Sequence, residues 1–329
     1  MAKTVRIHAY GGPEVLRIED VPLAEPGPGE VLLRQRAIGV NFADIHSREG
    51  RYPLPHLPHA IGGEAMGVVE AIGPGVTEFK IGDRAAYSTG GHALPRGAYT
   101  EARVLPAEHL VVLPDGIDDV TAAAMITKGL TAQYLLRDVF PVQAGQTILV
   151  HAAAGGVGTI LSQWAAHLGA TVIGVVSTEE KAALARAHGC AEVILSGRED
   201  IAARTRALTG GEGVPVVFDA VGKDTFEASL HALRPRGMLV SYGTASGPIP
   251  PFDLFRLNRM GSLYVTSAAF YWHMRTRAEM LGRAAELIEV VLSGAVKIAV
   301  NQRYALDEAA DAHRAMESRA TSGMSVLIP

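Results

Sequence analysis

The chain has 329 residues, 48% hydrophobic and 19% charged, a composition typical of a soluble globular protein of about two domains. Its net charge of −4 argues against a nucleic-acid partner, and no apolar run reaches the roughly 18 residues that a membrane span requires. The single cysteine, Cys190, excludes an intrachain disulfide and a zinc cage built from cysteines. The first residues enter a strand pattern without a signal-peptide core, so we expect cytoplasmic residence.

Residues 1 to about 125 contain short β-type segments separated by glycine and proline turns. Turn sequences occur at 26–30 (PGPGE), 73–75 (GPG) and 79–83 (FKIGD). Short strands with such frequent turns are typical of a barrel-like β domain. We therefore predict a β-barrel-type domain at the start of the chain.

From about residue 126 to 266 the pattern changes to strands alternating with helices. Strands are predicted at 147–151, 171–177, 192–195, 215–219, 238–242 and 262–266. The helices between them are centred near Ile160, Ala185, Ala203 and Ser229. Crossover helices between successive strands predict an α/β domain with a doubly wound parallel sheet of the Rossmann type.

The glycine turn after the first of these strands is the most informative segment. A GxGxxG frame falls on Ala153, Gly155 and Gly158, with alanine in place of the first glycine. A helix from near Gly156 to about Leu168 and a further strand follow within about 30 residues, which is the unit that binds dinucleotides. Turn N–H groups and the helix dipole attract the pyrophosphate. The predicted contacts are Ala154, Gly155, Gly156, Val157 and Gly158; the alternative is a tight turn without a ligand.

Beyond residue 266, helices are predicted at 276–292 and 306–318 and a strand at 324–328. Because β segments also begin the chain, we expect this last strand to return to the first domain. The predicted domains are therefore 1–125 together with 267–329, and 126–266.

Seven short runs, spread in order over both predicted domains, carry a resemblance to a known family. They lie at 11–16 (GGPEVL), 41–44 (NFAD), 82–84 (GDR), 128–131 (KGLT), 151–158 (HAAAGGVG), 261–266 (GSLYVT) and 317–321 (ESRAT). Nearly the whole chain resembles the NADPH-dependent quinone oxidoreductases, the zeta-crystallin-like branch of the zinc-free medium-chain dehydrogenase/reductases. The resemblance implies a GroES-like substrate domain, a Rossmann domain, a cleft between them and a homodimer.

The resemblance also implies the site residues. NADPH would lie at the carboxyl edge of the parallel sheet, with the nicotinamide facing the β domain near Asn41 and Thr131. Family positions that line the pocket match Asn41, Asp44, Tyr52, Lys128 and Thr131. The chain departs from some relatives at His46, where they carry tyrosine. Further expected cofactor contacts are Tyr134, Tyr242, Gly243, Val265, Thr266 and Arg319.

The end of the second Rossmann strand favours NADPH over NADH. An NAD site usually places a carboxylate there, whereas this strand ends at Ser177. Lys181 lies four residues further on and matches the family lysine for the 2′-phosphate. Relatives also contact the 2′-phosphate with a tyrosine, and Ser196 stands at that position here. We expect Ser196 or the nearby Arg198 to make this contact instead. Glu179 and Glu180 then only complement the helix dipole.

The predicted reaction is hydride transfer from the nicotinamide to a quinone, with Asn41, Tyr52 and Thr131 in the catalytic pocket. Tyr52 either supplies a hydroxyl near the acceptor oxygen or forms an aromatic wall. Asn41 either orients the nicotinamide or substrate or is only a turn residue. Asp44 is expected to hold the pocket backbone or Lys128, and Lys128 to pair with a carboxylate.

Other functions remain open from the residues alone. The same fold and hydride geometry serve reduction of an activated C=C bond, as in an enone or acyl thioester. A non-catalytic NADPH-binding protein is a third possibility, whereas no nucleic-acid or membrane partner is expected. A metal site of His56, His59, His92 and Glu64 is not favoured, because the first two flank Pro58 in an irregular loop.

Overall fold

The computed structural model describes residues 1–89 and 94–329 and contains two compact units. Unit 1 comprises Met1–Leu130, Phe270–Leu292 and Ile298–Pro329, and unit 2 comprises Thr131–Ala269 and Ser293–Lys297. Helix α2 (Asp119–Tyr134) crosses the division between them. Unit 2 also includes the short segment that follows α8 (Arg277–Leu292).

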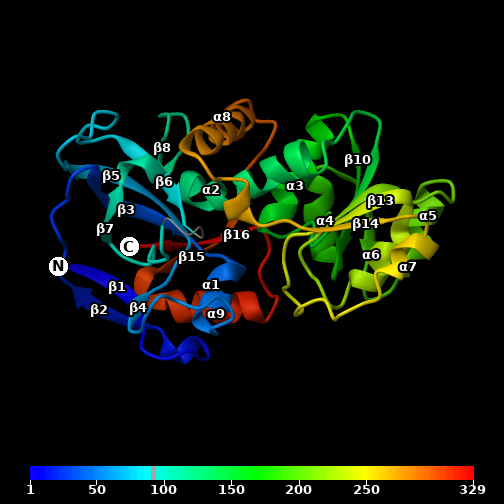
Figure 1. Cartoon of the computed structure of the whole chain (residues 1–329), viewed down its shortest axis with the longest axis horizontal. Helices are drawn as coiled ribbons and strands as arrows, with labels where there is room; N and C mark the ends of the chain where they lie inside the picture. Colours follow the sequence, from blue (N-terminus) through cyan, green and yellow to red (C-terminus); the bar gives the residue numbers. More distant parts are fainter. Residues whose placement is uncertain (90–93) are drawn as a thin grey trace. The chain divides into compact units, whose positions relative to one another are not determined.

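Unit 2 is built on one parallel sheet of six strands, drawn in green to orange in Figure 1. The strand order is β11-β10-β9-β12-β13-β14, with helices packed against the strands. Its strands are β9 (Thr147–His151), β10 (Thr171–Val176), β11 (Cys190–Leu195), β12 (Val214–Asp219), β13 (Leu233–Ser241) and β14 (Tyr264–Ser267). Its helices are α3 (Gly156–His167), α4 (Glu179–Ala187), α5 (Ile201–Leu208), α6 (Phe226–Ala232) and α7 (Phe255–Arg259).

This strand order determines where unit 2 can bind a ligand. If the six strands are numbered in chain order, their order across the sheet is 3-2-1-4-5-6. Successive strands are therefore added on one side of β9 first and then, from β12 on, on its other side. Ligands of doubly wound sheets bind at the carboxyl ends of the strands on either side of such a switch point. Every residue of β12 is buried, as are four of the five in β9, which explains their continuous apolar sequences. The predicted α/β Rossmann fold is confirmed.

Unit 1 contains a largely antiparallel sheet of seven strands and a smaller one of three. The larger follows the order β15-β16-β3-β5-β6-β8, with β7 also paired to β3. Its strands are β3 (Glu30–Gly39), β5 (Glu64–Ile72), β6 (Arg84–Ser88), β7 (Ala102–Pro106), β8 (Leu110–Val112), β15 (Val300–Ala305) and β16 (Met324–Ile328). The smaller contains β2 (Arg17–Val21), β1 (Ala2–Ile7) and β4 (His59–Ala60). As predicted, the last strand returns to this unit, where β16 pairs with β3.

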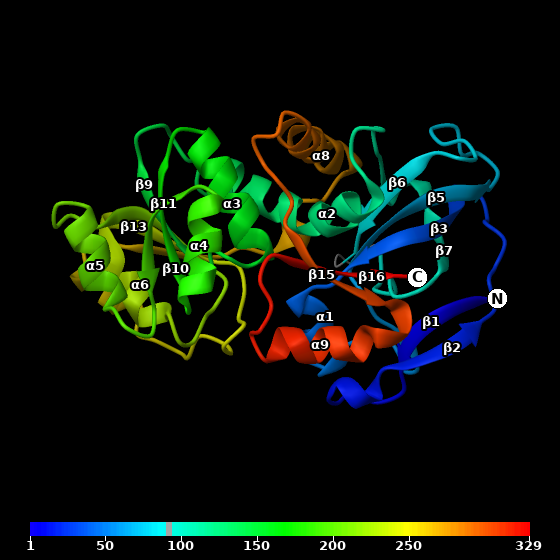
Figure 2. The same ribbon diagram turned by 180° about the vertical axis from the view of Figure 1, so that it is seen from behind.

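Two helices in unit 1 were not predicted from the β-type pattern of residues 1–125. Helix α1 (Phe42–Arg48) begins at the Asn41 N-cap, and α2 begins at Asp119. Near the other end of the chain, the predicted helix 306–318 is a 3₁₀ turn followed by α9 (Ala309–Glu317). Helices α1 and α9 lie side by side in both views (Figure 2). Helix α1 is short and lies among turn residues, so the local sequence does not indicate it. Its stability comes from the face that it buries.

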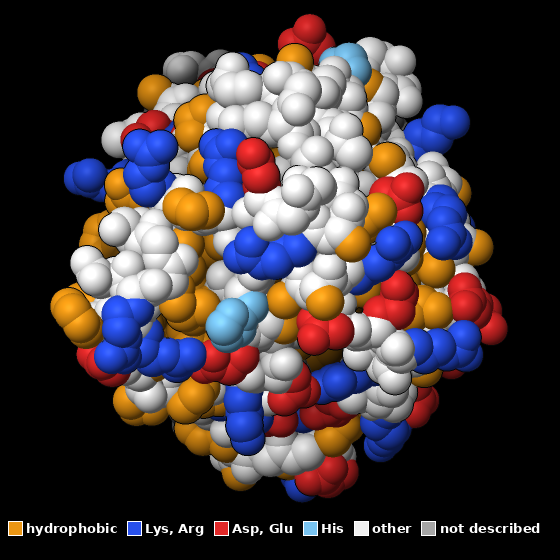
Figure 3. Space-filling model, turned by 90° about the vertical axis from the view of Figure 1, so that its right-hand side faces the viewer, with side chains coloured by type: hydrophobic (Ala, Val, Ile, Leu, Met, Phe, Trp, Pro, Cys, Tyr) orange, Lys and Arg blue, Asp and Glu red, His pale blue; other side chains and the backbone are white. Residues whose placement is uncertain are grey.

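The surface gives no sign of a single charged patch on the face in Figure 3, where acidic, basic and hydrophobic side chains are interspersed. Among the described residues, no helix is long and apolar enough to cross a membrane.

Candidate functional site

The glycine turn of unit 2 joins β9 to α3 at the switch point of the sheet. Ala152 adopts a positive φ of 51°, and Gly155 N–H donates to its carbonyl at 2.8 Å. Gly155 then forms the N-cap of α3 without a side-chain hydrogen bond. The first N–H groups of a helix have no partner within the helix, so those of α3 remain available to an anion. The arrangement therefore fits a pyrophosphate.

The two glycines of this turn have different steric roles. A Cβ on Gly158 would lie 2.2 Å from the Ala152 carbonyl oxygen and 2.8 Å from the Ala153 Cα, so the fold itself requires glycine there. A Cβ on Gly155 would lie 3.1 Å from the same oxygen, a contact that a small shift relieves. Gly155 is therefore needed less for folding than Gly158 is.

The alanine in place of the first motif glycine is accommodated by a glycine elsewhere. Ala153 is buried, and a Cβ on Gly174 of β10 would lie 2.9 Å from its methyl group. The same hypothetical Cβ would lie 2.7 Å from Cys190 Sγ. Gly174 thus provides the space for both side chains, and Cys190 is a buried free thiol.

Next along the carboxyl edge lie the predicted 2′-phosphate residues. Ser196 N–H donates to the Val176 carbonyl at 2.9 Å, which brings Ser196 beside the end of β10, where exposed Ser177 follows. Lys181 is in the first turn of α4, and its N–H donates to the Thr178 N-cap hydroxyl. Exposed Arg198 forms an ion pair of 3.2 Å with Glu179.

On the other side of the switch point, Asp219 ends β12 and organises the turn that follows. Its Oδ1 accepts from the N–H groups of Val221 and Gly222 at 2.7 and 3.1 Å. Its Oδ2 accepts from the hydroxyls of Thr225 and Ser229 at 2.7 and 2.8 Å. Four donors on one buried carboxylate fix the backbone at this end of the sheet.

Several predicted residues lie near this end of the sheet. Tyr242 N–H donates to the Asp219 carbonyl, and the Tyr242 hydroxyl is buried without a hydrogen-bond partner. Burial raises the pKa of Tyr242, with further contributions from Asp219 and Tyr134. Burial likewise raises the pKa of Tyr134, opposed by its hydrogen bond with Thr131. An orphaned buried hydroxyl beside Gly243 fits a ligand that supplies the missing partner.

Two further predicted residues of unit 2 belong to the sheet itself. Val265 and Thr266 lie within β14 and pair with Leu239 and Val240 of β13. They therefore occupy strand positions, whereas Tyr242 and Gly243 lie beyond the end of β13.

In unit 1, Asn41 and Asp44 form the start of α1. Asn41 is the N-cap, and its N–H donates to Asp44 Oδ2 at 2.9 Å. Asp44 is fully buried, and its Oδ1 accepts from Arg96 Nη1 at 3.0 Å. A Cβ on Gly63 would lie 3.1 Å from Asp44 Oδ1, so glycine allows the chain to approach this carboxylate closely. The expectation that Asp44 holds the pocket backbone is confirmed.

Lys128 pairs with a carboxylate, as expected, and that carboxylate belongs to Glu64. Lys128 Nζ lies 2.5 Å from Glu64 Oε1, which also accepts from Asn41 Nδ2 at 2.9 Å. Glu64 Oε2 accepts from the Thr127 N–H at 2.7 Å. Because Asn41 Nδ2 faces Glu64, the amide oxygen of Asn41 is the atom left to accept a further hydrogen bond. Glu64 therefore orients both Asn41 and Lys128.

The departure at His46 preserves an aromatic group on α1. The His46 ring packs edge-on against Tyr52 at 5.2 Å and lies 6.5 Å from Phe42. Tyr52 is 46% exposed, so one side of its ring is accessible. Burial lowers the pKa of His46, and its Nδ1 is buried without a hydrogen bond.

The remaining predicted residues are not part of these groups. Arg319 is exposed, just beyond α9, with a φ of 57°. The rings of His56 and His59 pack 4.8 Å apart, and His92 lies outside the described residues. In residues 1–89 and 94–329, no group of three or more His, Cys, Asp or Glu side chains is arranged to hold a metal.

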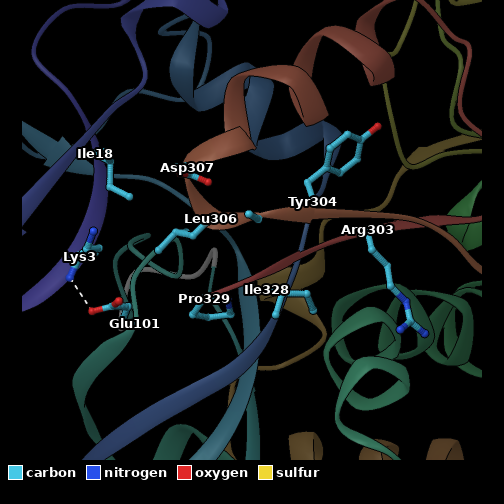
Figure 4. Close-up of a pocket in the computed structure, with 10 residues that line it drawn as sticks. Lys3, Ile18, Glu101, Arg303, Tyr304, Leu306, Asp307, Ile328 and Pro329 are labelled. Carbon is cyan, nitrogen blue, oxygen red and sulfur yellow. Dashed lines mark hydrogen bonds between the residues drawn. The ribbon is translucent and has the colours of Figure 1, made fainter.

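A surface cavity of about 580 Å³ lies elsewhere in unit 1, between β15, the chain end and β1 (Figure 4). It is lined by Lys3, Ile18, Glu101, Arg303, Tyr304, Ala305, Leu306, Asp307, Ile328 and Pro329. None of the predicted site residues lines it, and it is an open surface hollow.

The sequence reasoning missed the residues that hold the site. Glu64 was considered only as a metal ligand, and no pattern indicated Arg96 or Asp219. Each acts through a partner distant in the chain or through backbone N–H groups. Only a strand end followed by a turn, as at Asp219, could have signalled such a role.

Two family models match the chain, one within unit 1 and one mostly within unit 2. The alcohol dehydrogenase GroES-like domain matches residues 27–115, and the zinc-binding dehydrogenase domain matches residues 156–286. The paired domains define an oxidoreductase of the alcohol dehydrogenase type.

Full-length relatives narrow this class. Quinone oxidoreductase of Pseudomonas aeruginosa is 52% identical over 329 residues, covering 100% of both chains. A 2-haloacrylate reductase of Burkholderia sp is 45% identical over 338 residues, covering 100% of this chain and 99% of the other. The crystal structure of Escherichia coli quinone oxidoreductase complexed with NADPH has a TM-score of 0.96 at 42% identity, covering 99% of this chain and 100% of that one. The chain belongs to the quinone oxidoreductase family, which confirms the resemblance.

Proposed function

We propose that this chain catalyses the NADPH-dependent reduction of small quinones, as a zinc-independent cytoplasmic homodimer. The observation that carries the proposal is full-length similarity to quinone oxidoreductases, with 52% identity to the Pseudomonas aeruginosa enzyme. The carboxyl edge of the unit 2 sheet adds physical support, since its glycine turn and its unpartnered Tyr242 hydroxyl suit a dinucleotide. When bound, the cofactor supplies the hydride from nicotinamide C4.

The residues of unit 2 would bind and orient this cofactor. The N–H groups that follow Gly155 would hold the pyrophosphate, and Ser177, Lys181 and either Ser196 or Arg198 the 2′-phosphate. The nicotinamide end of the bound cofactor would lie against Tyr134, Tyr242 and Gly243. Val265, Thr266 and, from unit 1, Arg319 complete the proposed contact set, on the strength of the family resemblance.

Lys181→Ala should weaken NADPH binding and leave NADH binding nearly unchanged. Only NADPH loses a charge-assisted contact to the 2′-phosphate, worth roughly 1.5–3 kcal/mol or about 10- to 150-fold in affinity. Fluorescence titration of both cofactors measures the difference. The control is Arg186→Ala, an exposed cation in the last turn of the same helix. Equal losses for NADPH and NADH would contradict the assignment of Lys181.

The acceptor site would be formed by Asn41, Tyr52 and Thr131. The side-chain amide oxygen of Asn41, whose amide nitrogen donates to Glu64, would accept from the nicotinamide or from the acceptor. Tyr52, with its half-exposed ring, would present its hydroxyl to the acceptor oxygen. Asp44, Arg96 and Glu64 would hold this arrangement without contacting the acceptor.

Tyr52→Phe should lower quinone turnover about tenfold, because the lost hydroxyl would steady the acceptor oxygen by about 1.4 kcal/mol. The ring and its contact with His46 remain, so the thermal unfolding temperature should not change. Steady-state kinetics at saturating NADPH measure the effect. A several-thousandfold loss would show instead that Tyr52 is an obligatory acid.

A second candidate reaction is reduction of an activated C=C bond. The observation that favours it is the 45% identity to a 2-haloacrylate reductase over the full chain. Both reactions use hydride transfer to an electron-poor acceptor, so the fold does not distinguish them. The acceptor must therefore be decided by assay.

The decisive assay measures loss of NADPH absorbance with a panel of benzoquinones, naphthoquinones and enones, with and without a chelator. We expect turnover of quinones that the chelator does not change. Brisk enone reduction without quinone turnover would favour the second reaction. Tight NADPH binding without any turnover would indicate a binding protein, and loss of activity with stoichiometric zinc would contradict zinc independence.

The homodimer has a physical basis in the open edge of unit 2. Among the residues that the structure describes, strand β14 pairs with β13 alone, and it carries the exposed ring of Tyr264. An unpaired parallel edge is suited to pairing with a second copy of the same strand. Light scattering should give twice the chain mass of 34.7 kDa, and Val265→Pro should shift it toward the monomer. A monomeric mass for the unaltered chain would refute the dimer.

A further inference from the structure

A buried line of side chains runs through unit 1 from α9 to the start of α1. Arg48 forms a bidentate ion pair with Glu317, and its Nη1 lies 3.2 Å from Nδ1 of His313. His313 Nε2 lies 3.1 Å from the Tyr99 hydroxyl, which lies 3.2 Å from Asp44 Oδ2. All four members between Glu317 and the pocket are at most 1% exposed. Figure 2 shows that α1 and α9, which carry Arg48 and His313, are neighbours.

The chemistry of the two ends fixes every hydrogen in this line. A guanidinium has only donors, so His313 Nδ1 must accept from Arg48. The hydrogen of the neutral ring is then on Nε2, which donates to the Tyr99 oxygen. The Tyr99 hydroxyl is left to donate to Asp44. Burial and the charge of Arg48 lower the pKa of His313 to about 3, in agreement with a neutral ring.

Asp44 closes the line as an anion. Its Oδ1 faces Arg96 Nη1 and its Oδ2 faces the Asn41 N–H, and neither group can accept a proton. A proton on either oxygen would therefore face a donor that cannot accept it. Burial, the largest influence, and Glu64 of β5 hold the pKa of Asp44 above its ordinary value, although Arg96, the Asn41 N–H and Lys128 of α2 lower it.

We propose that His313, held as the Nε2–H tautomer by Arg48, is a positioning residue that directs the Tyr99 hydroxyl onto Asp44 and keeps this carboxylate ionised beneath Asn41. The consequence for catalysis rests on the proposed function, in which Asn41 contacts the cofactor or acceptor. Protonation of Asp44 would release Arg96 and the Asn41 N–H together. The line therefore sets the lowest pH at which the pocket stays assembled.

The sign of the effect follows from the direction of the hydrogen bonds. A donor to an ionised carboxylate favours the charged form and lowers its pKa. Removing the Tyr99 hydroxyl, or the His313 ring that orients it, should therefore raise the pH at which Asp44 takes up a proton. A lost hydrogen bond to a charged group corresponds to a shift of about one to two pH units.

The test uses four variants of the full chain. Tyr99→Phe removes the donor to Asp44, and His313→Leu removes the ring. His313→Gln retains one acceptor and one donor and should rescue the line. Arg314→Gln, on the same helix but in an exposed pair with Asp311, is the matched control.

The first readout is nuclear magnetic resonance with labelled histidine and aspartate, which needs no activity. We expect His313 to stay neutral with its proton on Nε2 from pH 5 to 9, and the Asp44 carboxylate to titrate higher in Tyr99→Phe and His313→Leu. A proton on His313 Nδ1, or an Asp44 titration unchanged in both variants, overturns the proposal whatever the activity. If the unaltered protein reduces no acceptor, the proposed function fails while this readout still decides the role of His313.

The second readout is the pH profile of kcat/KM for the acceptor that the panel identifies. We expect the acid limb to move up by about one to two pH units in Tyr99→Phe and His313→Leu, with KM for NADPH unchanged. His313→Gln and Arg314→Gln should keep the profile of the unaltered protein. A loss of rate that is equal at every pH would show a purely structural role and overturn the proposal.

Discussion

Gly155→Val should abolish NADPH binding while the chain still folds. Gly155 has an extended backbone with φ −86° and ψ 175°, which any residue adopts, and the only close contact of an added Cβ is the Ala152 carbonyl oxygen, at 3.1 Å. A valine side chain at this N-cap would project where the pyrophosphate must approach the N–H groups of α3. Loss of even one charge-assisted contact costs about 1.5–3 kcal/mol, and steric exclusion removes several, so affinity should fall at least about 100-fold.

The matched variant for this prediction is Gly158→Val, three residues further into the helix. Its Cβ would lie 2.2 Å from the Ala152 carbonyl oxygen, a contact that the closely packed turn cannot relieve. We expect this variant to unfold or aggregate, whereas Gly155→Val retains its thermal transition. Calorimetry and NADPH titration on both proteins separate the two roles. A folded Gly155→Val that still binds NADPH tightly would move the cofactor site elsewhere.

Glu64→Gln should reduce the free energy of unfolding by about 3–5 kcal/mol, because it leaves the Lys128 ammonium buried without its hydrogen-bonded carboxylate. Glu64 is fully buried, and the side chain of Lys128 is only 7% exposed, so water screens neither charge. The substitution also replaces the carboxylate that accepts from Lys128 Nζ by an uncharged side-chain amide. Urea denaturation followed by far-ultraviolet circular dichroism measures the loss of stability.

The control for this prediction removes the second charge as well. Glu64→Gln combined with Lys128→Met should recover most of the lost stability, since a paired removal leaves no isolated buried charge. Stability should return even though Asn41 has lost its carboxylate partner, so quinone turnover should stay low in both proteins. A single-variant loss below about 1 kcal/mol would mean that the pair behaves as a surface ion pair.

Much of the fold was predictable because its signals are local. The strand predicted at 147–151, the glycine turn and the helix from Gly156 occur as predicted, each set by a few consecutive residues. Boundaries moved where tertiary pairing extends a strand: β11 begins at Cys190, two residues earlier than predicted, where Cys190 pairs with Val172. Helix α1 escaped detection because its turn-rich surroundings favoured β segments and its stability comes from burial.

The candidate site also contains residues that local sequence predicts and residues that it does not. Residues whose role depends on a neighbour in sequence, such as the Gly155 turn and Lys181 after Ser177, could be proposed from spacing alone. The supporting contacts could not, because nothing in a local pattern pairs Glu64 with Lys128, 64 residues away, or Arg48 with His313, 265 residues away.

The sequence by itself therefore determined the class of fold, the position of the glycine turn and the family, since periodicity and short motifs specify these locally. Only the tertiary structure decided which buried charges meet. It paired Lys128 with Glu64, a carboxylate that the sequence could not name, and it connected Asp44 to His313 through Tyr99. The physical reason is that a buried charge is stabilised by whichever partner the fold brings within hydrogen-bonding distance, and that choice depends on long-range packing.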